Sequence, residues 1–323
     1  MSTRPIRVFV INAPEAIGGV TWWRMYRPLQ LLHRLYPDIE IVHNETGMLY
    51  PHHFQYVDVV LCFRPSEPAH VAGIRMAVSA GVPVISDYDD DLINLPIGHP
   101  RWAFFKDKEK YIRPCVAMST QLWVSTPALA EVYGHPDTQV IPNAVLPSDI
   151  PEEIGEHSGT VAWRGGELHR EDLEIYNFRN DYISSLKKIR RFLWIGYMPT
   201  WAIVPDSKAQ IQFESADIDT RTWFSYLRQQ RLQAIVKPLM PCQFNDCKSN
   251  IAWIEATVSG AVCVTNYAGK PGWEGALMQM PKNEESRQFV WEMSKTNIIQ
   301  NYNLQTWNEV RYREILGVAY GTS

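Results

Sequence analysis

The chain has 323 residues, which is enough for two domains of ordinary size, each with its own core. Hydrophobic residues make up 46% and charged residues 20%, as in a soluble globular protein, and no apolar run approaches the roughly 20 residues that span a bilayer. A net charge of -4 lacks the basic excess of many nucleic-acid-binding proteins, and five cysteines without CxxC spacing give no sign of structural zinc.

The first half of the chain alternates short apolar runs with helical patterns. Strands are expected at 6–12, 39–43, 57–63, 82–86, 122–125 and 140–145, with a helix over 22–35. Runs this rich in valine and isoleucine, separated by amphipathic helices, predict a parallel sheet covered on both faces. A polar segment with prolines, 147–159, then predicts a linker.

The same pattern restarts after the linker. Strands are expected at 160–163, 192–196, 210–213, 234–236 and 262–265, and the tail from 284 is helical in pattern. The sequence therefore predicts an α/β protein of two doubly wound, Rossmann-like domains with a cleft between them. The expected units are residues 1–150, residues 151–285 and C-terminal helices over 286–323.

A glycine-rich loop follows the first expected strand and opens the first helix. It contains Gly18 and Gly19, and Arg24 lies in the helix that follows. The spacing is not G-x-G-x-x-G, so the loop lacks the dinucleotide-binding signature. Arg24 is either a cation that faces the cleft or an ordinary solvated helix residue.

The most concentrated negative charge follows the strand at 82–86. Its members are Asp87, Asp89, Asp90 and Asp91. Carboxylates so close together repel one another, so some should have raised pKa values or should contact a cation or substrate hydroxyls. Three interpretations stay open: a divalent-metal site, binding or deprotonation of a substrate hydroxyl, and an acidic helix N-cap.

An arginine and two glycines stand where the first strand of the second half turns into a helix. They are Arg164, Gly165 and Gly166, and His169 and Arg170 follow. Glycines let backbone N–H groups approach a phosphate closely, and arginine can bind two of its oxygens at once. The turn predicts one side of a phosphate site, and the alternative is a merely structural turn.

The segment FNDCKSNIAWIE carries the strongest signal. We expect a helix that begins near Lys248, runs to Gly260 and is capped by Ser249 or Asn250. Its free N–H groups and the charge of Lys248 would attract a diphosphate. Glu255 lies roughly 10 Å further along the helix, where it could accept hydrogen bonds from ribose hydroxyls. The alternative is a capped helix with a solvated glutamate.

This segment resembles the donor-binding part of family 4-type glycosyltransferases of the GT-B fold, especially short phage and bacterial members. The residues that carry the resemblance are Pro238, Leu239, Phe244, Asn245, Lys248, Ser249 and Glu255. The turn at Arg164 is similar to the family's R-G-G followed by H-x-x-D, and the acidic run is similar to one in phage-type members. Many relatives have a second glutamate where this chain has Cys247.

The resemblance implies a GT-B glycosyltransferase that uses a nucleotide sugar and retains the anomeric configuration, with the final helix crossing back to the first domain. In this chain Arg164 and Lys248 would stabilise the departing nucleoside diphosphate. The full sets are Asp89, Asp90, Asp91, Arg164 and Lys248 as catalytic residues; Gly18, Gly19, Arg164, Gly165, Gly166, His169, Arg170, Lys248, Ser249, Asn250 and Glu255 for the nucleotide sugar; and Arg24, Asp87 and His99 for the acceptor.

The resemblance also implies the partners. The expected donor is a UDP or GDP sugar, with no required cofactor and no metal, because the DxD metal motif belongs to a different glycosyltransferase fold. The expected acceptor is a hydroxymethylated pyrimidine in phage DNA or a glycan. The alternatives are a protein that binds a sugar nucleotide without transfer, which the residue Cys247 keeps open, and a sugar-nucleotide epimerase. Because the N-terminus leads directly into a strand and shows no signal peptide, we expect a cytoplasmic protein, in the host cytoplasm if phage-encoded.

Overall fold

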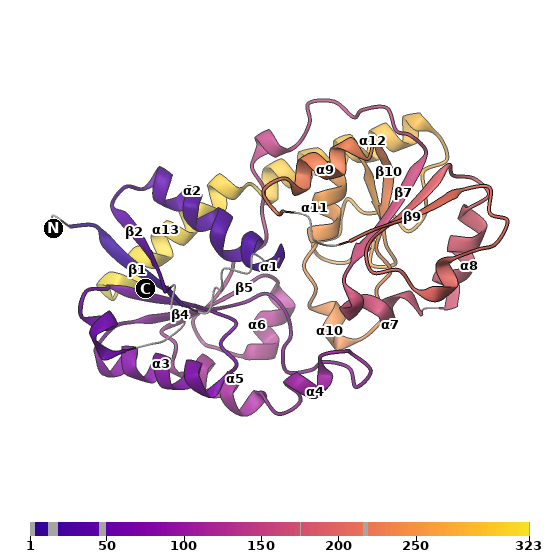
Figure 1. Cartoon of the computed structure of the whole chain (residues 1–323). Coiled ribbons are helices and arrows are strands. Elements are labelled where there is room, and N and C mark those ends of the chain that lie inside the picture. Colours follow the sequence, from indigo (N-terminus) through magenta and orange to yellow (C-terminus); the bar gives the residue numbers. More distant parts are fainter. Residues whose placement is uncertain (1–3, 12–18, 45–49, 175, 216–218, 323) are drawn as a thin grey trace.

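The computed structural model describes residues 4–11, 19–44, 50–174, 176–215 and 219–322. In these residues the chain forms two lobes, and each lobe is a parallel sheet with helices on both faces (Figure 1). The two doubly wound α/β domains predicted from the alternation of strands and helices are confirmed. Among the described helices, none combines the length and the apolar character that crossing a bilayer requires.

The sheet of the N-terminal lobe has the order β2-β1-β3-β4-β5-β6 in the described residues, and all neighbours are parallel. Its strands are β1 (Ile6–Ile11), β2 (Ile39–His43), β3 (Val59–Phe63), β4 (Val84–Tyr88), β5 (Gln121–Val124) and β6 (Thr138–Val140). Successive side chains of a strand point to opposite faces, so Val8 and Val10 enter one core while Phe9 and Ile11 enter another.

The helices of this lobe fill both faces of its sheet. They are α1 (Gly19–Thr21), α2 (Arg27–Leu35), α3 (Pro68–Ser79), α4 (Trp102–Phe105), α5 (Glu109–Met118) and α6 (Pro127–Tyr133), with a π-helical turn at Trp22–Tyr26. Leu29 and Leu32 of α2 pack with Val8, and Ile74 of α3 packs with Phe9. Each face of the sheet is therefore buried by a different helix.

The sheet of the C-terminal lobe has the order β11-β10-β7-β8-β9 over the described ranges, again all parallel. Its strands are β7 (Thr160–Gly165), β8 (Arg191–Gly196), β9 (Gln210–Glu214), β10 (Leu232–Val236) and β11 (Val262–Val264). Its helices are α7 (Arg170–Leu173), α8 (Tyr176–Ser185), α9 (Trp223–Gln229), α10 (Gln243–Asp246) and α11 (Ile251–Val258). Trp163 and Trp194 pack toward α7 and α8, whereas Ala162 and Leu193 pack toward α11.

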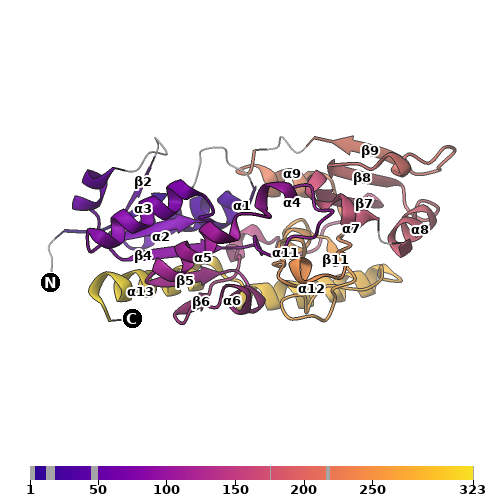
Figure 2. The same cartoon turned by 90° about the horizontal axis from the view of Figure 1, so that it is seen from below.

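The last two helices divide between the lobes. Helix α12 (Glu284–Asn301) packs Trp291 and Ile298 into the C-terminal lobe, and α13 (Leu304–Tyr320) packs Ile315 and Val318 into the N-terminal lobe. Asn303 separates them, and its side chain caps α13 by accepting a hydrogen bond from the N–H of Gln305 at 2.9 Å. Figure 2 shows both helices along the same side of the molecule, one beneath each lobe.

One expected strand differs from the structure. The segment 140–145 was predicted as a strand, but β6 ends at Val140. Pro142 has no N–H group to donate to a neighbouring strand, so the ladder cannot continue through it. Val145 instead forms an isolated parallel bridge with Asn303, and this bridge connects the end of the N-terminal lobe to the start of α13.

Candidate functional site

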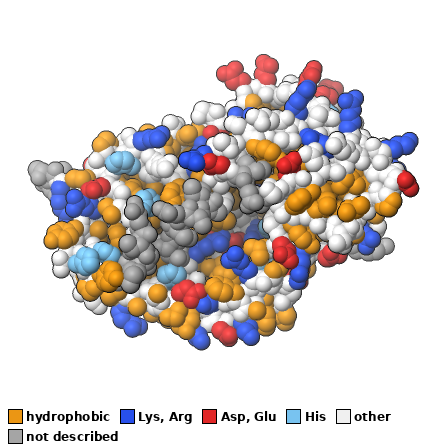
Figure 3. Space-filling model, in the orientation of Figure 1, with side chains coloured by type: hydrophobic (Ala, Val, Ile, Leu, Met, Phe, Trp, Pro, Cys, Tyr) orange, Lys and Arg blue, Asp and Glu red, His pale blue; other side chains and the backbone are white. Residues whose placement is uncertain are grey.

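A cavity of about 210 Å³ lies between the two lobes. It is at the carboxyl ends of the strands of both sheets, which is where open α/β sheets bind ligands. Figure 3 shows the molecule hollowed between the lobes, with Lys and Arg side chains recessed in the hollow. The polar residues that line the cavity are Arg64, Asp89, Asp90, His99, Arg101, Arg164, His169, Lys237, Lys248 and Ser249.

Two of these cations come from adjacent strands at the point where the order of the C-terminal sheet reverses. The chain runs from β7 outward through β8 and β9, and then returns to β10 on the other side of β7. Arg164 lies near the end of β7, and Lys237 directly follows β10. Such a switch point opens a crevice between the two strand ends, so both cations lie where this fold binds ligands.

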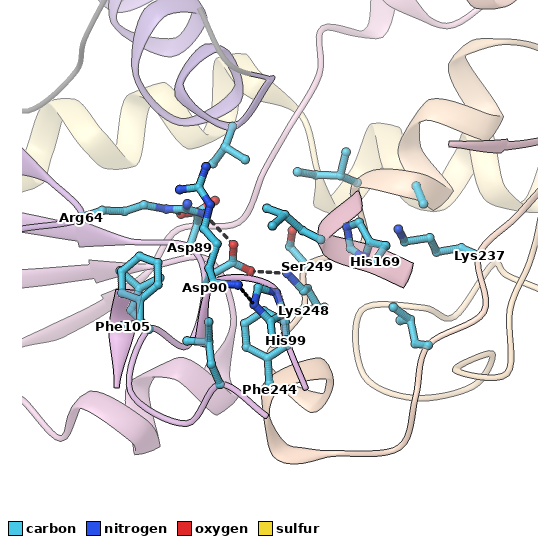
Figure 4. Close-up of a pocket in the computed structure, with 18 of the residues that line it drawn as sticks. Arg64, Asp89, Asp90, His99, Phe105, His169, Lys237, Phe244, Lys248 and Ser249 are labelled. Atoms are coloured by element: carbon cyan, nitrogen blue, oxygen red, sulfur yellow. Dashed lines mark hydrogen bonds and ion pairs between the residues drawn. The ribbon is translucent and has the colours of Figure 1, made fainter. Parts of the chain in front are cut away.

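A chain of ion pairs crosses from one lobe to the other (Figure 4). Arg64 forms an ion pair with Asp89, and its Nη2 donates to Oδ2 of Asp90 at 2.6 Å. On the far side, Nζ of Lys248 donates to Oδ1 of the same Asp90 at 2.7 Å. Asp90 is therefore the carboxylate that connects the two lobes. Arg64 has a φ of 46°, a left-handed conformation that is unusual for a residue other than glycine.

The two neighbouring carboxylates differ in their pKa values. The pKa of Asp89 is raised, because burial and the charge of Asp90 act against the ion pair with Arg64. Burial would also raise the pKa of Asp90, but Lys248 and Arg64 outweigh it and lower that pKa to about 2. The prediction that carboxylates of this run either contact a cation or have raised pKa values is confirmed.

Glu255 is in contact with Arg164. The carboxylate is 1% exposed, forms an ion pair with Nε of Arg164, and accepts a hydrogen bond from Nε1 of Trp223 at 2.9 Å. Burial raises its pKa. Glu255 does not line the cavity directly, and Arg164 lies between them. A ribose could reach this carboxylate only after Arg164 had moved to another anion.

His169 is neutral and held in one tautomer. Its Nδ1 is 2.8 Å from Oδ2 of Asp172, whose other oxygen accepts hydrogen bonds from the N–H of Met240 at 2.9 Å and Nδ2 of Asn245 at 2.6 Å. Burial, with the charges of Lys237 and Lys248, lowers the pKa of His169 to about 3. Because Nδ1 donates to Asp172, Nε2 is the unprotonated nitrogen and can accept a hydrogen bond in the cavity.

Several residues predicted for the acceptor or for catalysis lie outside the cavity. Arg24 and Asp87 form a buried ion pair at 2.5 Å, and Arg24 also donates to the carbonyl of Ile141. Oδ1 of Asp91 accepts hydrogen bonds from the N–H groups of Ile93 and Asn94. Asp91 therefore caps backbone N–H groups as the N-cap interpretation expects, but it caps those of a turn and not of a helix. Within the described residues these three side chains are fully engaged in structural contacts, whereas Asp89, Asp90 and His99 line the cavity.

Of the predicted glycines that the structure describes, Gly19, Gly165 and Gly166, none lines the cavity. A Cβ on Gly165 would lie 2.9 Å from Trp163 and 3.0 Å from His169, so this glycine allows close packing of the turn. Gly166 and Gly19 are exposed, with nothing near their missing Cβ. Gly18 lies outside the described residues. Arg170 faces Glu167 at 3.8 Å on the surface.

The helix predicted to begin at Lys248 begins later. Helix α11 starts at Ile251 and ends at Val258, because the N–H of Lys248 bonds to the carbonyl of Asn245 and closes the turn of α10. Neither expected cap is formed, since the side chain of Asn250 makes no capping bond and Ser249 accepts a hydrogen bond from Nδ2 of Asn143 at 2.9 Å. Lys248 therefore belongs to the connection between α10 and α11.

Cys247 occupies an apolar position between the lobes. It is 2% exposed and packs with Tyr88, Leu92 and Leu129 of the N-terminal lobe. Its backbone carbonyl accepts a hydrogen bond from Oγ1 of Thr126 at 3.1 Å. A glutamate at this position would place a carboxylate among these apolar side chains, so this chain uses the position for contact between its lobes.

Three cavity cations, Arg101, Arg64 and Lys237, were missed by the sequence reasoning, and the last two are at strand ends. Each directly follows a buried strand, Arg64 after β3 and Lys237 after β10. This position was the available signal, because the carboxyl ends of parallel strands meet at the ligand-binding edge.

In the part of the chain that the structure describes, the cavity included, no group of three or more His, Cys, Asp or Glu side chains is arranged to hold a metal ion.

No family model and no curated protein matches the sequence. The structure is similar to HepE from Anabaena in complex with UDP-glucose, with a TM-score of 0.64 and 11% identity over 97% of this chain and 100% of HepE. It is also similar to a glycosyltransferase from Rickettsia africae, with a TM-score of 0.61 and 13% identity over 98% and 99% of the two chains. For TarM from S. aureus in a complex that includes UDP, the values are 0.57 and 14% over 82% of this chain and 57% of TarM. At these identities the likeness shows the fold, and the predicted GT-B fold of two Rossmann-like domains is confirmed.

Proposed function

We propose that this protein is a glycosyltransferase that moves a sugar from a UDP-sugar to an acceptor hydroxyl. The observation that carries the proposal is that Arg164 and Lys248, from two separate segments, line one cavity between the lobes. Two fixed cations at the ligand-binding edge suit a diphosphate. The similar structures support UDP as the nucleotide, since HepE and TarM were each solved with UDP or a UDP-sugar.

The proposed chemistry requires negative charge to be stabilised on the leaving group. As the glycosidic bond breaks, charge grows on the diphosphate, and cations that are already in place lower the barrier. In the structure Lys248 is paired with Asp90, and Arg164 with Glu255. The donor phosphates would replace both carboxylates as partners. This exchange would release Glu255 for the ribose and Asp90 for a hydroxyl of the sugar or acceptor.

The size of the cavity agrees with such an exchange of partners. Small-molecule sites are typically about 300–1,000 Å³, and the cavity here is about 210 Å³. The cavity is therefore smaller than this usual range. We infer that the ion pairs at Asp90 hold the lobes together without donor, and that the lobes separate when a whole nucleotide sugar enters.

The acceptor we propose is a hydroxyl of a glycan or of a hydroxymethylated pyrimidine in DNA, with retention of the anomeric configuration, as the resemblance of the segment around Lys248 implies. The test is a transfer assay with UDP-sugars and three acceptor sets: glycans, unmodified DNA and 5-hydroxymethylpyrimidine DNA. Transfer to one set identifies the acceptor, and proton NMR of the product gives its anomeric configuration.

One observation favours a second candidate, binding of a sugar nucleotide without transfer. Cys247 lies in an apolar contact where many enzymes of the resembled family carry a glutamate, so that acid is absent from the site. Donor hydrolysis or transfer would reject this candidate. Stabilisation by UDP-sugar without any consumption would support it.

The donor site itself is tested by thermal unfolding with UDP, GDP, ADP and TDP. At about a hundred times its dissociation constant, a bound nucleotide should stabilise the wild type by roughly 2.7 kcal/mol. Lys248→Ala should weaken binding by about tenfold or more, because a phosphate contact in a partly buried site is lost. Lys270→Ala is the matched control, since Lys270 is an exposed lysine of the same lobe outside the cavity. If none of the nucleotides stabilises the wild type, the donor site is wrongly assigned.

A further inference from the structure

Lys237 is a buried cation at the centre of the proposed donor site. Lys237 is 6% exposed and directly follows β10, and its side chain points into the cavity toward His169 (Figure 4). Its backbone N–H donates to the carbonyl of Val264 at 2.8 Å. Across the described residues, its ammonium has no hydrogen bond and no carboxylate within ion-pair distance, and it lies 5.7 Å from the centre of the Trp163 ring, which gives at most a weak cation–π contact.

The groups around this ammonium raise the free-energy cost of its positive charge. Arg164 on β7 and Lys248 beside α11 are both cations and repel it, while burial removes its hydration. Cys263 on β11 also faces it, but burial raises the pKa of that thiol to about 12, so it carries no charge near neutral pH. His169 is a neutral imidazole. Within the described residues, no hydrogen bond joins any of these four groups to the ammonium of Lys237.

Two carboxylates attract Lys237 from a distance, and both are engaged elsewhere. Asp172 on α7 is bound to His169 and to the amide of Asn245. Glu255 on α11 is paired with Arg164 and accepts a hydrogen bond from Trp223. Their attraction does not compensate for burial and for the two cations, and the pKa of Lys237 is lowered to about 7. Near neutral pH the free protein therefore holds this lysine on the boundary between its charged and neutral forms.

We propose that Lys237 is a third ligand of the donor diphosphate, beside Arg164 and Lys248, and that it takes up a proton from solvent when the diphosphate binds. This inference rests on the proposed function and adds to it one further ligand of the diphosphate and the uptake of one proton on binding. The ammonium of Lys237 is buried, has no hydrogen-bond or ion-pair partner, and points into a cavity with two other cations. One diphosphate could bind all three. The step is protonation of the neutral amine to an ammonium, followed by its hydrogen bond to a phosphate oxygen.

The direction of the pH dependence follows from this linkage. A bound dianion favours the charged lysine, so the pKa of Lys237 rises in the complex. Above about pH 7 the free protein has lost the proton and the complex keeps it, so binding consumes up to one proton and the affinity falls by up to about tenfold per pH unit. Below about pH 6 the lysine is already charged and the uptake disappears. The terminal phosphate of UDP titrates at about pH 6, outside the window above pH 7.

In the free protein the histidines of the cavity and Asp90 do not titrate in this window. The pKa values of His169 and His99 are both lowered, so these imidazoles are neutral above pH 7. The pKa of Asp90 is about 2, so it is charged throughout. Asp90 and Glu255 are paired with Lys248 and Arg164 in the free protein and would also gain proton affinity if phosphates replaced them, so the uptake that is lost in Lys237→Met is the part assigned to Lys237.

The experiment is isothermal titration calorimetry of the whole protein at pH 8, with UDP and separately with inorganic pyrophosphate, in HEPES and in Tris buffer, neither of which supplies a phosphate. The difference between buffers reports the protons taken up. The wild type should take up close to one proton with UDP. Pyrophosphate itself still carries a proton at pH 8 and can release it on binding, so with pyrophosphate the readout is the difference in uptake between the wild type and Lys237→Met. Lys237→Met should lose this uptake, bind at least tenfold more weakly at pH 6.5, and show no fall in affinity from pH 7 to 9. Lys237→Arg, which stays charged, should bind without proton uptake.

The outcomes separate this inference from the proposed function. If UDP binds the wild type without proton uptake, or if Lys237→Met keeps the wild-type affinity and uptake, Lys237 is not a ligand and the donor site still stands. If pyrophosphate binds with an uptake that Lys237→Met loses and UDP does not bind, the lysine site stands and the nucleotide function fails. If neither probe binds the folded wild type, both are wrong. Circular dichroism of each variant establishes that it is folded.

Discussion

Asp90 is the carboxylate on which the two lobes meet. It receives Lys248 from the C-terminal lobe and Arg64 from its own lobe, and the two cations lower its pKa to about 2 against the effect of burial. A carboxylate with a pKa below its ordinary value stabilises the folded state above pH 3.8, and that contribution is lost as the pH falls toward 2. The same group would also exchange its lysine partner for a donor phosphate.

Asp90→Asn tests this role through pH. The wild type should lose about 1 kcal/mol of unfolding free energy between pH 6 and pH 3 through this one group, and the variant should lack that part of the loss. Urea unfolding at the two pH values measures it. Asp181→Asn, at an exposed position on α8, serves as the control and should keep the wild-type profile. An unchanged pH profile in Asp90→Asn would show that the ion pairs at Asp90 add nothing to stability.

The connection between α10 and α11 is the element that joins the donor side of the cavity to the N-terminal lobe. Three consecutive residues make its contacts: the carbonyl of Cys247 with Thr126, the ammonium of Lys248 with Asp90, and the hydroxyl of Ser249 with Asn143. The side chain of Cys247 anchors the connection in an apolar cluster. A phosphate that binds Lys248 would therefore act directly on the contact between the lobes.

Cys247→Glu tests whether this position is a contact or a vacant catalytic position. A carboxylate in the apolar cluster should lower the unfolding free energy at pH 7 by about 2–4 kcal/mol and should not increase transfer or donor hydrolysis. Burial raises the pKa of such a glutamate, so the loss should be smaller at pH 5. Thermal unfolding at both pH values is the measurement, with Cys247→Ser as the milder control. A variant as stable as the wild type, with higher turnover, would instead identify a lost catalytic acid.

The whole molecule is held together by the division of its tail between the two lobes. Helix α12 completes one face of the C-terminal lobe, and α13 completes one face of the N-terminal sheet, where the amide of the buried Asn308 donates to the carbonyl of Pro28 at 2.9 Å. The last helix of the chain is thus part of the core formed by the first strands. The proposed separation of the lobes would bend the chain near Asn303, between the two helices, and near the linker that leads to β7.

Ile315→Ala tests the assignment of α13 to the N-terminal lobe. Ile315 is fully buried with Val8 and Leu61, and truncation should cost about 2–4 kcal/mol. Hydrogen exchange read by mass spectrometry should show faster exchange in β1 and β3 and little change in β7 and β8. Tyr320→Ala removes an exposed side chain of the same helix and should change neither lobe. Faster exchange confined to the C-terminal lobe would contradict the packing of α13.

The sequence by itself determined the layout of strands and helices. Each buried strand is a short run of valine, isoleucine and similar residues, so the expected segments agree with ten of the observed strands to within a few residues. The exception, β6, was displaced because Pro142 interrupts the ladder. The placement of Arg164 at the cavity was also predictable, because the end of a strand is a local property of the chain, whereas Lys248 reaches the cavity from the connection between α10 and α11 and not from a helix start.

Only the tertiary structure decided which charges face one another. Asp90 and Lys248 are 158 residues apart, and Arg24 and Asp87 are 63 apart, so no local pattern relates them. Asp87 and Asp90 belong to one acidic run, yet one forms a buried structural pair and the other joins the lobes. The energy of a charge depends on its burial and on its partner, and both are set by long-range contacts. For that reason the unpaired ammonium of Lys237 became visible only in the folded molecule.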